Sequence, residues 1–230
     1  MCPVQLAVVT GYVQLLDHPR KHEEYERLGA RLGELGEALV LPFRCSLRDC
    51  WLNEHTRDSD VKHAVADNPN KNTRAYHVVQ HQKTAWLLQA RDIEPRADVL
   101  IWLDYGIFHQ PGVTAAHIDA FLRVVRAHPK FAIPGAWEQS SGAVDWPDWR
   151  FCGSTIVVPR NHVENFHEAV RAVTLERLTR DNYLTWEVND WAAVEGRGDL
   201  PIQWYKADHN QTQFTNYARS GRGTTARQPA

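Results

Sequence analysis

Apolar runs of strand length alternate with segments of helical periodicity along most of the chain. The run from Leu6 to Val13 is nearly continuous, which is typical of a strand buried on both faces of a sheet, and Gly11 marks where it is expected to leave the sheet. From His22 to Gly36 the apolar residues recur as on one face of a helix, and this face contains Tyr25, Leu28, Leu32 and Leu35. The same alternation predicts strands at residues 38–42, 97–104, 131–134, 154–158 and 202–205, and helices that begin near residues 73, 114 and 161 or contain residues 186–194.

Strands that alternate with helices favour a mainly parallel sheet that is covered by helices on both faces. A chain of 230 residues suits one α/β domain of ordinary size. We therefore predict a single α/β domain over residues 1–213, with a Rossmann-like, mainly parallel central sheet. Residues 214–230 contain little to bury, and we expect them to form a disordered tail.

Two segments interrupt this alternation, and both are candidates for function. Residues 43–72 are polar without clear periodicity, and a loop of that length inside a compact domain is either functional or disordered. Residues 135–150 are rich in tryptophan and glycine, with Glu138 beside Trp137 and Asp145 beside Trp146. Indole rings are suited to stacking on sugar faces, while carboxylates bind hydroxyls. The second segment is therefore a candidate binding loop. The alternative is that at least two of its rings cover the core, as we expect for Trp149, which adjoins the strand at Phe151.

Composition and charge exclude several classes of function. The net charge of −2 gives the chain no global attraction to nucleic acid or to an anionic membrane. No apolar run approaches the roughly 20 residues that span a bilayer, and no basic region precedes an apolar stretch at the N-terminus. These features predict a cytoplasmic protein without a membrane span. The glycine-rich phosphate loops of nucleotide-binding proteins and the GxSxG pattern of hydrolases are absent from the sequence.

The four cysteines are expected to be free thiols in a reducing compartment. Cys45 and Cys50, with His55 and His63, have the ligand types that zinc prefers, but their spacing matches no common zinc site. Zinc binding at this cluster is an open alternative.

Asp104 ends a buried strand, and it is the clearest candidate for chemistry. Ligands in parallel sheets bind beyond the carboxyl ends of the strands, so a carboxylate there faces the expected crevice. Gly106, two residues later, allows a sharp turn and close approach of a ligand. A carboxylate oxygen suits Mg²⁺ or Mn²⁺ bridging a diphosphate, and such sites often use only one or two protein carboxylates. The alternative is an aspartate that merely caps the turn.

The order of these segments resembles a known class of enzymes. The strand VVTGYV, the helical segment KTAWLL at residues 83–88 and the strand VLIWLDYGIF are similar to the nucleotide-sugar-binding half of GT-A glycosyltransferases. The segment WLDYGIF further resembles the W-[IL]-D-[FY]-G segment of bacterial and phage HtrL/YibB-type glycosyltransferases. The similarity extends from the first strand to about His209. GT-A enzymes usually carry a DxD motif, whereas this chain has a single aspartate in the D-Y-G of residues 104–106.

The resemblance implies metal-dependent, inverting transfer of a sugar from a nucleotide-diphosphate sugar, such as a UDP-sugar. It implies that Asp104 and His209 hold Mn²⁺ or Mg²⁺, and that Lys83 neutralises donor phosphate. A solvated helix lysine is the alternative for Lys83. For His209 the alternatives are a plain surface histidine and metal binding by the neighbouring Asp208 instead. The donor-binding residues that the resemblance implies are Thr10, Gly11, Tyr12, Lys83, Asp104, Tyr105 and Gly106.

Glu187 and Asp190 are the candidates for a catalytic base. They lie three residues apart on a predicted helix and are expected to share a face. Inverting transfer needs a carboxylate within about 3 Å of the acceptor hydroxyl. GT-A enzymes often place this base on a helix after the acceptor-side strand, and Glu187 is the favoured residue. The alternative is an acidic pair that faces solvent or caps the helix.

The acceptor is expected to be a cell-surface glycan, held by Trp137, Glu138 and Trp146. A second hypothesis is a hydroxymethylated base in phage-type modified DNA, because basic residues near the polar segment suit phosphates. These basic residues, with acidic ones interleaved, are Arg44, Arg48, Arg57, Lys62, Lys71 and Arg74. Two further alternatives are a nucleotidyltransferase with the same sheet architecture and a non-catalytic module that binds glycans or nucleotide sugars.

Overall fold

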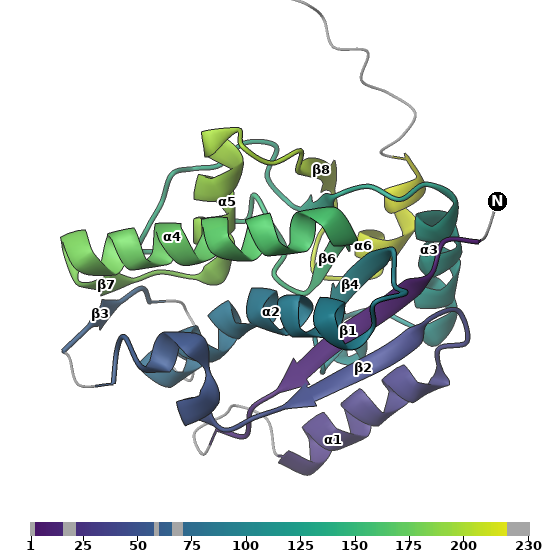
Figure 1. Cartoon of the computed structure of the whole chain (residues 1–230), viewed down its shortest axis with the longest axis horizontal. Coiled ribbons are helices and arrows are strands. Elements are labelled where there is room, and N and C mark those ends of the chain that lie inside the picture. The colour runs from purple at the N-terminus through teal and green to yellow at the C-terminus, as the bar shows by residue number, and fades with distance from the viewer. Residues whose placement is uncertain (1–2, 16–21, 58–59, 66–70, 220–230) are drawn as a thin grey trace, which may run out of the picture.

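A six-stranded sheet forms the centre of the fold, in the order β2-β1-β4-β6-β5-β8 (Figure 1). Its strands are β1 (Leu6–Tyr12), β2 (Leu39–Arg44), β4 (Val99–Leu103), β5 (Ala132–Gly135), β6 (Thr155–Pro159) and β8 (Gln203–Lys206). Neighbouring strands pair in parallel except at β6, which is antiparallel to both β4 and β5. A two-stranded pair of β3 (Lys62–His63) and β7 (Tyr183–Leu184) lies beyond one end of this sheet (Figure 1). The computed structural model describes residues 3–15, 22–57, 60–65 and 71–219.

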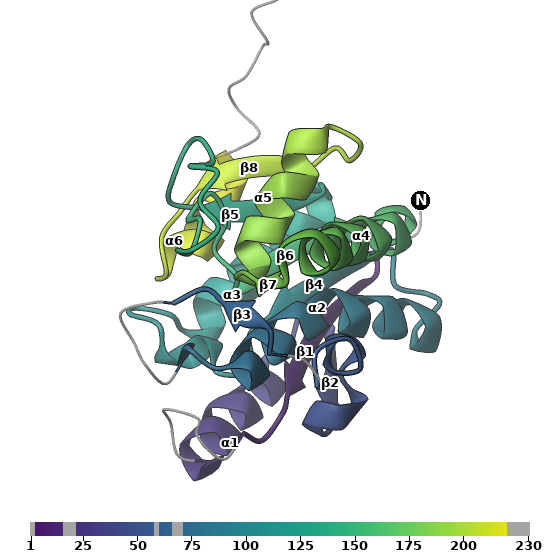
Figure 2. The same cartoon turned by 90° about the vertical axis from the view of Figure 1, so that its left-hand side faces the viewer.

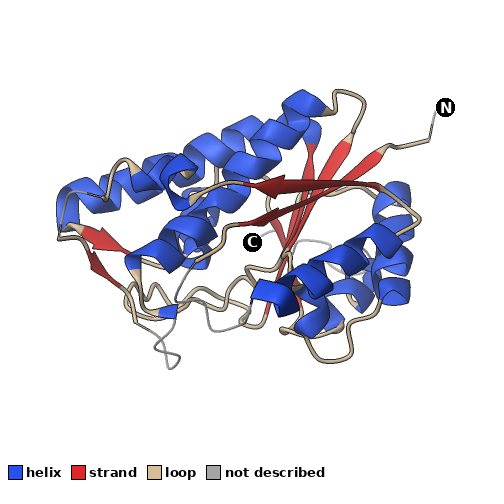
Figure 3. Cartoon of the chain, turned by 90° about the horizontal axis from the view of Figure 1, so that it is seen from below, coloured by secondary structure: helices blue, strands red, loops and turns tan. Residues whose placement is uncertain are grey.

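Helices cover both faces of the sheet (Figure 3). They are α1 (His22–Ala30), α2 (Arg74–Ile93), α3 (Ala115–Ala127), α4 (Val163–Asp181), α5 (Glu187–Arg197) and α6 (Thr212–Thr215). Helices α2, α4 and α5 pack over one face, and α1, α3 and α6 pack over the other. This arrangement confirms the predicted α/β fold with a mainly parallel sheet. Within the described residues, no helix combines the length and the apolar character needed to cross a lipid bilayer.

Alternating side chains along each strand build two separate cores. In β4, Leu100 and Trp102 belong to the core beneath α2, α4 and α5, whereas Val99, Ile101 and Leu103 belong to the core on the opposite face. Every residue of β4 is buried, because helices cover both faces of the sheet at this strand. The continuous apolar run in the sequence is the direct consequence.

Gly11 has a different structural role from the one that the sequence predicts. It lies inside β1, pairs with Phe43 of β2, and the strand continues to Tyr12. A Cβ atom at position 11 would collide with the indole of Trp86, which stacks on Trp102 with ring centroids 5.6 Å apart. The glycine is therefore required by the close approach of an α2 side chain to the strand, and not by a turn.

The polar segment at residues 43–72 carries more structure than the sequence predicts. Strand β2 extends through Arg44, and short 3₁₀ helices follow at Leu47–Asp49 and Trp51–Asn53. Strand β3 then pairs in parallel with β7, which lies far along the chain. Helices of a single turn show no periodicity, and a pairing between distant segments leaves no local signal, so pattern analysis missed both. Residues 58–59 and 66–70 lie outside the described residues.

The packed part of the chain extends past the boundary predicted at residue 213. Phe214 and Tyr217 are 3% and 1% exposed, and both rings pack edge-on against Phe121 of α3. The expected tail is therefore folded over residues 214–219, because these aromatic rings complete the core under α3. Residues 220–230 lie outside the described residues.

We predict that Gly11→Ala lowers the free energy of unfolding by about 1–3 kcal/mol, because the added methyl group overpacks against Trp86. Gly33→Ala is a matched control, since a Cβ atom at position 33 meets nothing within 4 Å. Urea unfolding of the wild type and both variants measures the two effects. Equal effects of the two substitutions would contradict the packing role of Gly11.

Candidate functional site

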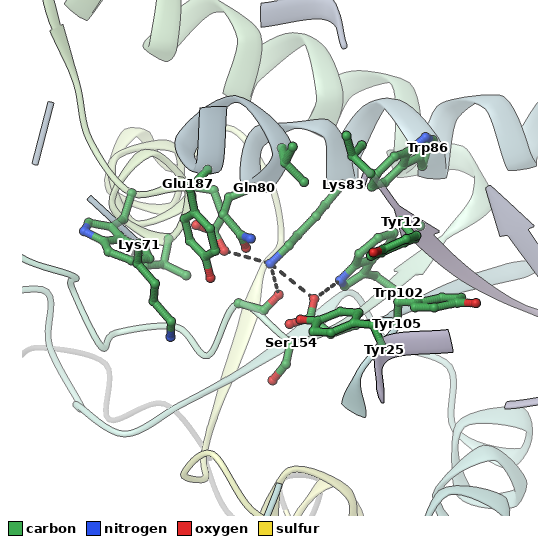
Figure 4. A pocket seen from close by; sticks show the side chains of 18 of the residues that line it. Tyr12, Tyr25, Lys71, Gln80, Lys83, Trp86, Trp102, Tyr105, Ser154 and Glu187 are labelled. Carbon is green, nitrogen blue, oxygen red and sulfur yellow. Dashed lines mark hydrogen bonds and ion pairs between the residues drawn. The ribbon is translucent and has the colours of Figure 1, made fainter. Parts of the chain in front are cut away.

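A pocket lies at the carboxyl ends of β1 and β4, where ligands bind in open α/β sheets. Its wall contains the end of β1, the residues that follow β4, one face of α2, the segment before β6 and the start of α5. Figure 4 shows Lys83, Glu187, Tyr12 and Tyr105 converging on this pocket from different elements. The fold thus collects widely separated segments around Asp104, at the edge of the sheet that the sequence predicts.

Lys83 occupies the centre of the charged network in the pocket (Figure 4). Its Nζ atom lies 2.8 Å from Glu187 Oε1 and 3.3 Å from Asp104 Oδ1, and it donates a hydrogen bond of 2.8 Å to the Gly153 carbonyl. The side chains of Lys83 and Glu187 are each 4% exposed, whereas that of Asp104 is 32% exposed. Burial by itself lowers the pKa of Lys83, but Asp104 and Glu187 together outweigh burial and raise it. The ammonium therefore stays charged and holds both carboxylates.

Glu187 begins α5 and is ionised in this setting. Burial by itself raises the pKa of Glu187, but Lys83, His81 and a backbone N–H together outweigh burial and lower it. In the part of the chain that the structure describes, no group hydrogen-bonds to the second carboxylate oxygen, Oε2, although this atom is buried. Glu187 lines the pocket, so Oε2 is a buried acceptor beside the pocket that no described residue pairs with. A carboxylate with a lowered pKa is a weak base at neutral pH, and it suits holding a hydroxyl better than deprotonating it.

The structure divides Glu187 and Asp190 between the pocket and the core. Asp190 is 1% exposed and lies outside the pocket wall. Its carboxylate accepts a hydrogen bond of 2.6 Å from the Thr174 hydroxyl, and lies 3.1 Å from His81 Nε2 and 3.2 Å from Arg177 Nη2. Burial lowers the pKa of His81, but Asp190 and neighbouring acceptors outweigh burial and raise it. Asp190 therefore connects α5 to α2 and α4. Glu187 and Asp190 do not share a catalytic face, contrary to the expectation from the sequence.

Asp104 and His209 both line the pocket, as the resemblance implies. The indole Nε1 of Trp102 donates a hydrogen bond of 2.8 Å to Asp104 Oδ1, the same oxygen that faces Lys83. Burial lowers the pKa of His209, which favours the neutral imidazole that metal binding requires. Among the described residues, no three His, Cys, Asp or Glu side chains come together as a metal-binding group. A cation at this site would therefore take most of its ligands from a bound substrate and from water.

The zinc alternative at Cys45 and Cys50 is not formed in the described structure. Their sulfur atoms lie 3.9 Å apart, and both residues are free cysteines. His55 lies against Glu54, and the ring of His63 lies 5.4 Å from that of His77. The two histidines do not join the cysteines in any metal-binding group within the described residues.

Three stacked tyrosines form one wall of the pocket, which we call the tyrosine wall. The ring of Tyr12 lies 5.1 Å from that of Tyr105 and 5.5 Å from that of Tyr25, with near-parallel planes. The Tyr105 hydroxyl donates to Glu26 at 2.9 Å, and Arg44 forms an ion pair with the same carboxylate at 2.5 Å. From the sequence, Tyr25 was expected on the apolar face of a helix, and Arg44 was a candidate for contact with DNA phosphates. The structure instead uses both to build the tyrosine wall.

The other residues predicted for the site are divided between the pocket and its surroundings. Gly11 lines the pocket, whereas the Thr10 side chain is 1% exposed and, like Gly106, lies outside the wall. Trp137 and Trp146 are 40% and 54% exposed and lie on the loop that follows β5, outside the pocket wall. Glu138 is exposed on the same loop.

The structure also assigns pocket residues that sequence analysis missed. Trp149, expected to cover the core, lines the pocket and packs edge-on against His209 with ring centroids 4.7 Å apart. Gly153 lies against the charged network, because a Cβ atom there would collide with Glu187 Oε1. The sequence contains a signal for Gly153, since this glycine comes directly before a buried strand, where close backbone approach is common.

Basic residues of the polar segment have partners within the protein. Arg74 donates to the Asn53 side chain at 3.0 Å and to the Thr56 hydroxyl at 2.8 Å, and Arg48 lies 3.8 Å from Asp49. With Arg44 in the tyrosine wall, these contacts favour a structural role over a phosphate-binding role for Arg44 and Arg74, whereas Lys71 lines the pocket.

Comparisons with known proteins identify the fold. No protein-family model matches the sequence, and no curated protein matches it. The structure is similar to that of a glycosyltransferase involved in the glycosylation of the major capsid of PBCV-1, with a TM-score of 0.51, 11% identity, and coverage of 88% of this chain and 81% of that chain. It also has a TM-score of 0.45 and 8% identity to 4-diphosphocytidyl-2C-methyl-D-erythritol synthase from Anaerococcus prevotii, over 94% of this chain and 95% of that chain. The first similarity shows a GT-A-like, Rossmann-type fold, while the narrower resemblance to HtrL/YibB-type enzymes stays a prediction.

We predict that Lys83→Met lowers the free energy of unfolding by about 3 kcal/mol at neutral pH, because it leaves the buried Glu187 carboxylate without its partner. With Lys83 removed, burial dominates and should raise the pKa of Glu187 above its unfolded value. A group whose pKa is raised on folding stabilises the folded state at low pH, and this stabilisation is lost as pH rises. The penalty should therefore shrink as pH falls from about 7.5 to about 4.5.

Urea unfolding at both pH values measures this change. The double variant Lys83→Met/Glu187→Gln is the control, because it removes the titrating carboxylate and should lose that part of the pH dependence. A penalty that stays constant with pH in the single variant would argue against an ionised, buried Glu187.

Proposed function

We propose that this chain is a glycosyltransferase that moves a sugar from a nucleotide-diphosphate sugar to a hydroxyl of a glycan. The observation that carries the proposal is the Lys83–Asp104–Glu187 network, which lies in a pocket at the carboxyl ends of parallel strands. The pocket belongs to a GT-A-like fold, and a solved glycosyltransferase with that fold supports the reaction class. Function is grafted onto a fold by its site, so the pocket residues make the proposal specific.

The nucleotide is assigned to the side of the pocket that holds the tyrosine wall. Aromatic rings offer a nucleobase a stacking surface, and the hydrogen bonds through Glu26 and Arg44 fix the position of Tyr105. A UDP-sugar is the donor that we propose. Lys83 already faces two carboxylates and a carbonyl, which match the three donors of its ammonium. Its proposed role is therefore to hold Asp104 and Glu187, rather than to neutralise phosphate directly.

The charges around Asp104 support a divalent cation. Asp104 and Glu187 face the single ammonium of Lys83, so this cluster keeps one negative charge, while a second lysine, Lys71, also lines the pocket. We propose that Asp104 and His209 hold Mn²⁺ or Mg²⁺ together with the diphosphate, which completes the ligand set that the protein alone lacks. The cation, when bound, neutralises the diphosphate and assists its departure.

Glu187 is the candidate base that lines the pocket, and its environment changes the role we assign to it. Its lowered pKa and the acceptor Oε2, which no described residue pairs with, support the binding of a substrate hydroxyl. Inversion with Glu187 as the base stays a hypothesis. A pH–rate profile tests it. If Glu187 is the base, activity should fall only at acidic pH, where the carboxylate becomes protonated, and Glu187→Gln should remove this acidic limb of the profile.

We predict that a nucleoside diphosphate with Mn²⁺ raises the melting temperature by about 5 °C or more at roughly 100 times its dissociation constant. Asp104→Asn should abolish this shift, because it removes a carboxylate charge from the proposed cation site. Asp98→Asn is the matched control, since Asp98 lies at the opposite end of β4 and accepts a hydrogen bond from the Gln5 backbone. An unchanged shift in Asp104→Asn would refute the donor site.

Mass detection of transfer from a panel of nucleotide sugars separates an enzyme from a binding module. Stabilisation by nucleotide without transfer to any acceptor, and without hydrolysis of the donor, would support the non-catalytic alternative.

A further inference from the structure

The loop that carries the exposed tryptophans is held in one conformation by its own hydrogen bonds. We call residues 136–149, which run beside α5, the tryptophan loop (Figure 2). At its base, the Trp149 carbonyl accepts hydrogen bonds of 2.9 Å from the N–H groups of both Ala136 and Trp137. In its interior, the Asp148 side chain accepts from the Ser140 hydroxyl at 2.5 Å and from the Gly142 N–H at 3.3 Å. A carboxylate shared in this way stabilises the loop from within.

Asn189 of α5 attaches the outer part of the tryptophan loop to the helix that borders the pocket. Its side-chain Nδ2 donates hydrogen bonds of 2.7 Å to the carbonyls of Ala143 and Trp146. Its Oδ1 accepts a hydrogen bond of 2.8 Å from the Asp148 N–H. Only this orientation of the amide satisfies two carbonyls and one N–H together. Asn189 is 4% exposed, so these hydrogen bonds are largely shielded from water.

The residues between these attachment points are anchored as well. The Thr185 hydroxyl donates to the Val144 carbonyl at 2.7 Å, and the Tyr183 hydroxyl donates to the Asp145 carboxylate at 2.6 Å. The Asp145 carbonyl accepts from the N–H of Val65, beside β3, at 3.3 Å. Residues 143–146 are thus each attached to another part of the protein. Their backbone conformation is determined by contacts outside the loop.

The side chains of this anchored segment nevertheless face solvent. Trp146 is 54% exposed, Val144 is 38% exposed, and Trp137 and the neighbouring Val65 are 40% and 47% exposed. Large apolar side chains that stay exposed on a fixed backbone are candidates for a binding surface. A rigid aromatic surface also loses little conformational entropy when it binds.

We propose that Asn189 is a positioning residue, which holds the tryptophan loop as a preformed surface for a glycan acceptor. The inference rests on the proposed glycosyltransferase function and specifies its acceptor site. Indole faces suit the flat, hydroxyl-rich rings of sugars, whereas the carboxylates of Glu138 and Asp145 repel the phosphates of nucleic acid. The loop ends at Trp149 in the pocket wall, and Asn189 lies on the same helical turn as Glu187. An acceptor on the loop is therefore held at a constant distance from the pocket.

The surface is tested by saturation-transfer NMR with maltohexaose, cellohexaose and chitohexaose. At least one of these neutral oligosaccharides should bind the wild type, and Trp137→Ala or Trp146→Ala should weaken that binding by about tenfold or more. Ile93→Ala is the matched control, because Ile93 is an exposed apolar residue, 63% exposed, at the far end of α2. It should bind as the wild type does.

The role of Asn189 is tested with two variants. Asn189→Ala removes three hydrogen bonds to the loop, whereas Thr185→Val removes one and preserves the packing volume. Hydrogen exchange at the amides of residues 140–146 should accelerate by about tenfold or more in Asn189→Ala and by less in Thr185→Val. Oligosaccharide binding should weaken in the same order, while the stabilisation by nucleoside diphosphate and Mn²⁺ stays at the wild-type value.

Three results would overturn the inference. The first is that the wild-type protein binds none of the oligosaccharides. The second is that it binds duplex DNA and that this binding depends on Trp146. The third is that Asn189→Ala shows faster hydrogen exchange in the loop but binds oligosaccharide as the wild type does. The nucleotide assay keeps these failures apart from failure of the proposed function. Wild-type protein that is stabilised by nucleotide but ignores oligosaccharides refutes the acceptor surface alone, whereas absence of nucleotide stabilisation refutes the donor site.

Discussion

The buried ammonium of Lys83 is the constraint on which the pocket depends. A charge that is only 4% exposed is stable only beside opposite charge, and here the opposite charges come from two other elements. Asp104 follows β4, and Glu187 begins α5, which lies 104 residues further along the chain than Lys83. The network therefore requires α2, β4 and α5 to be correctly placed relative to one another. The Lys83–Asp104–Glu187 network carries one net negative charge, which is compatible with the proposed cation, and Lys71 adds a positive charge to the pocket wall.

A series of packing contacts orients Asp104, and the series begins at Gly11, which has no side chain. Gly11 leaves room for the Trp86 ring, Trp86 stacks on Trp102, and the Trp102 indole donates to Asp104. The orientation of the exposed carboxylate is thus set by close-packed rings beneath the pocket. Gly153 has the matching role on the other side, where its carbonyl accepts from Lys83 and its lack of a side chain leaves space for Glu187. Substitutions at these glycines are expected to disturb the site through packing, without touching a ligand.

Local patterns in the sequence predicted the six strands of the central sheet, helices α1 to α5 and the position of Asp104, because burial on both faces and the end of a strand leave local signals. The same patterns missed the partner of Lys83, since an ion pair between residues 104 positions apart has no spacing rule. The i, i+3 rule placed Glu187 and Asp190 on one face, and that expectation assumes a helix with one side in solvent. Helix α5 is buried around most of its first two turns, so neighbouring faces meet different environments. Tyr25 was misread for a related reason, because an apolar stripe does not distinguish a core contact from a pocket wall.

The first turn of α5 joins the pocket, the core and the tryptophan loop. Glu187 contributes to the pocket, Asn189 holds the loop, and Asp190 bonds to α2 and α4. Because these three side chains leave one helical turn in different directions, the loop cannot move relative to the pocket unless it breaks its hydrogen bonds to Asn189. A hinged loop would close over its substrate and add an opening step to each turnover. The described contacts instead favour a rigid surface for the proposed acceptor, on which specificity would come from the shape presented by Trp137 and Trp146 and not from a conformational change.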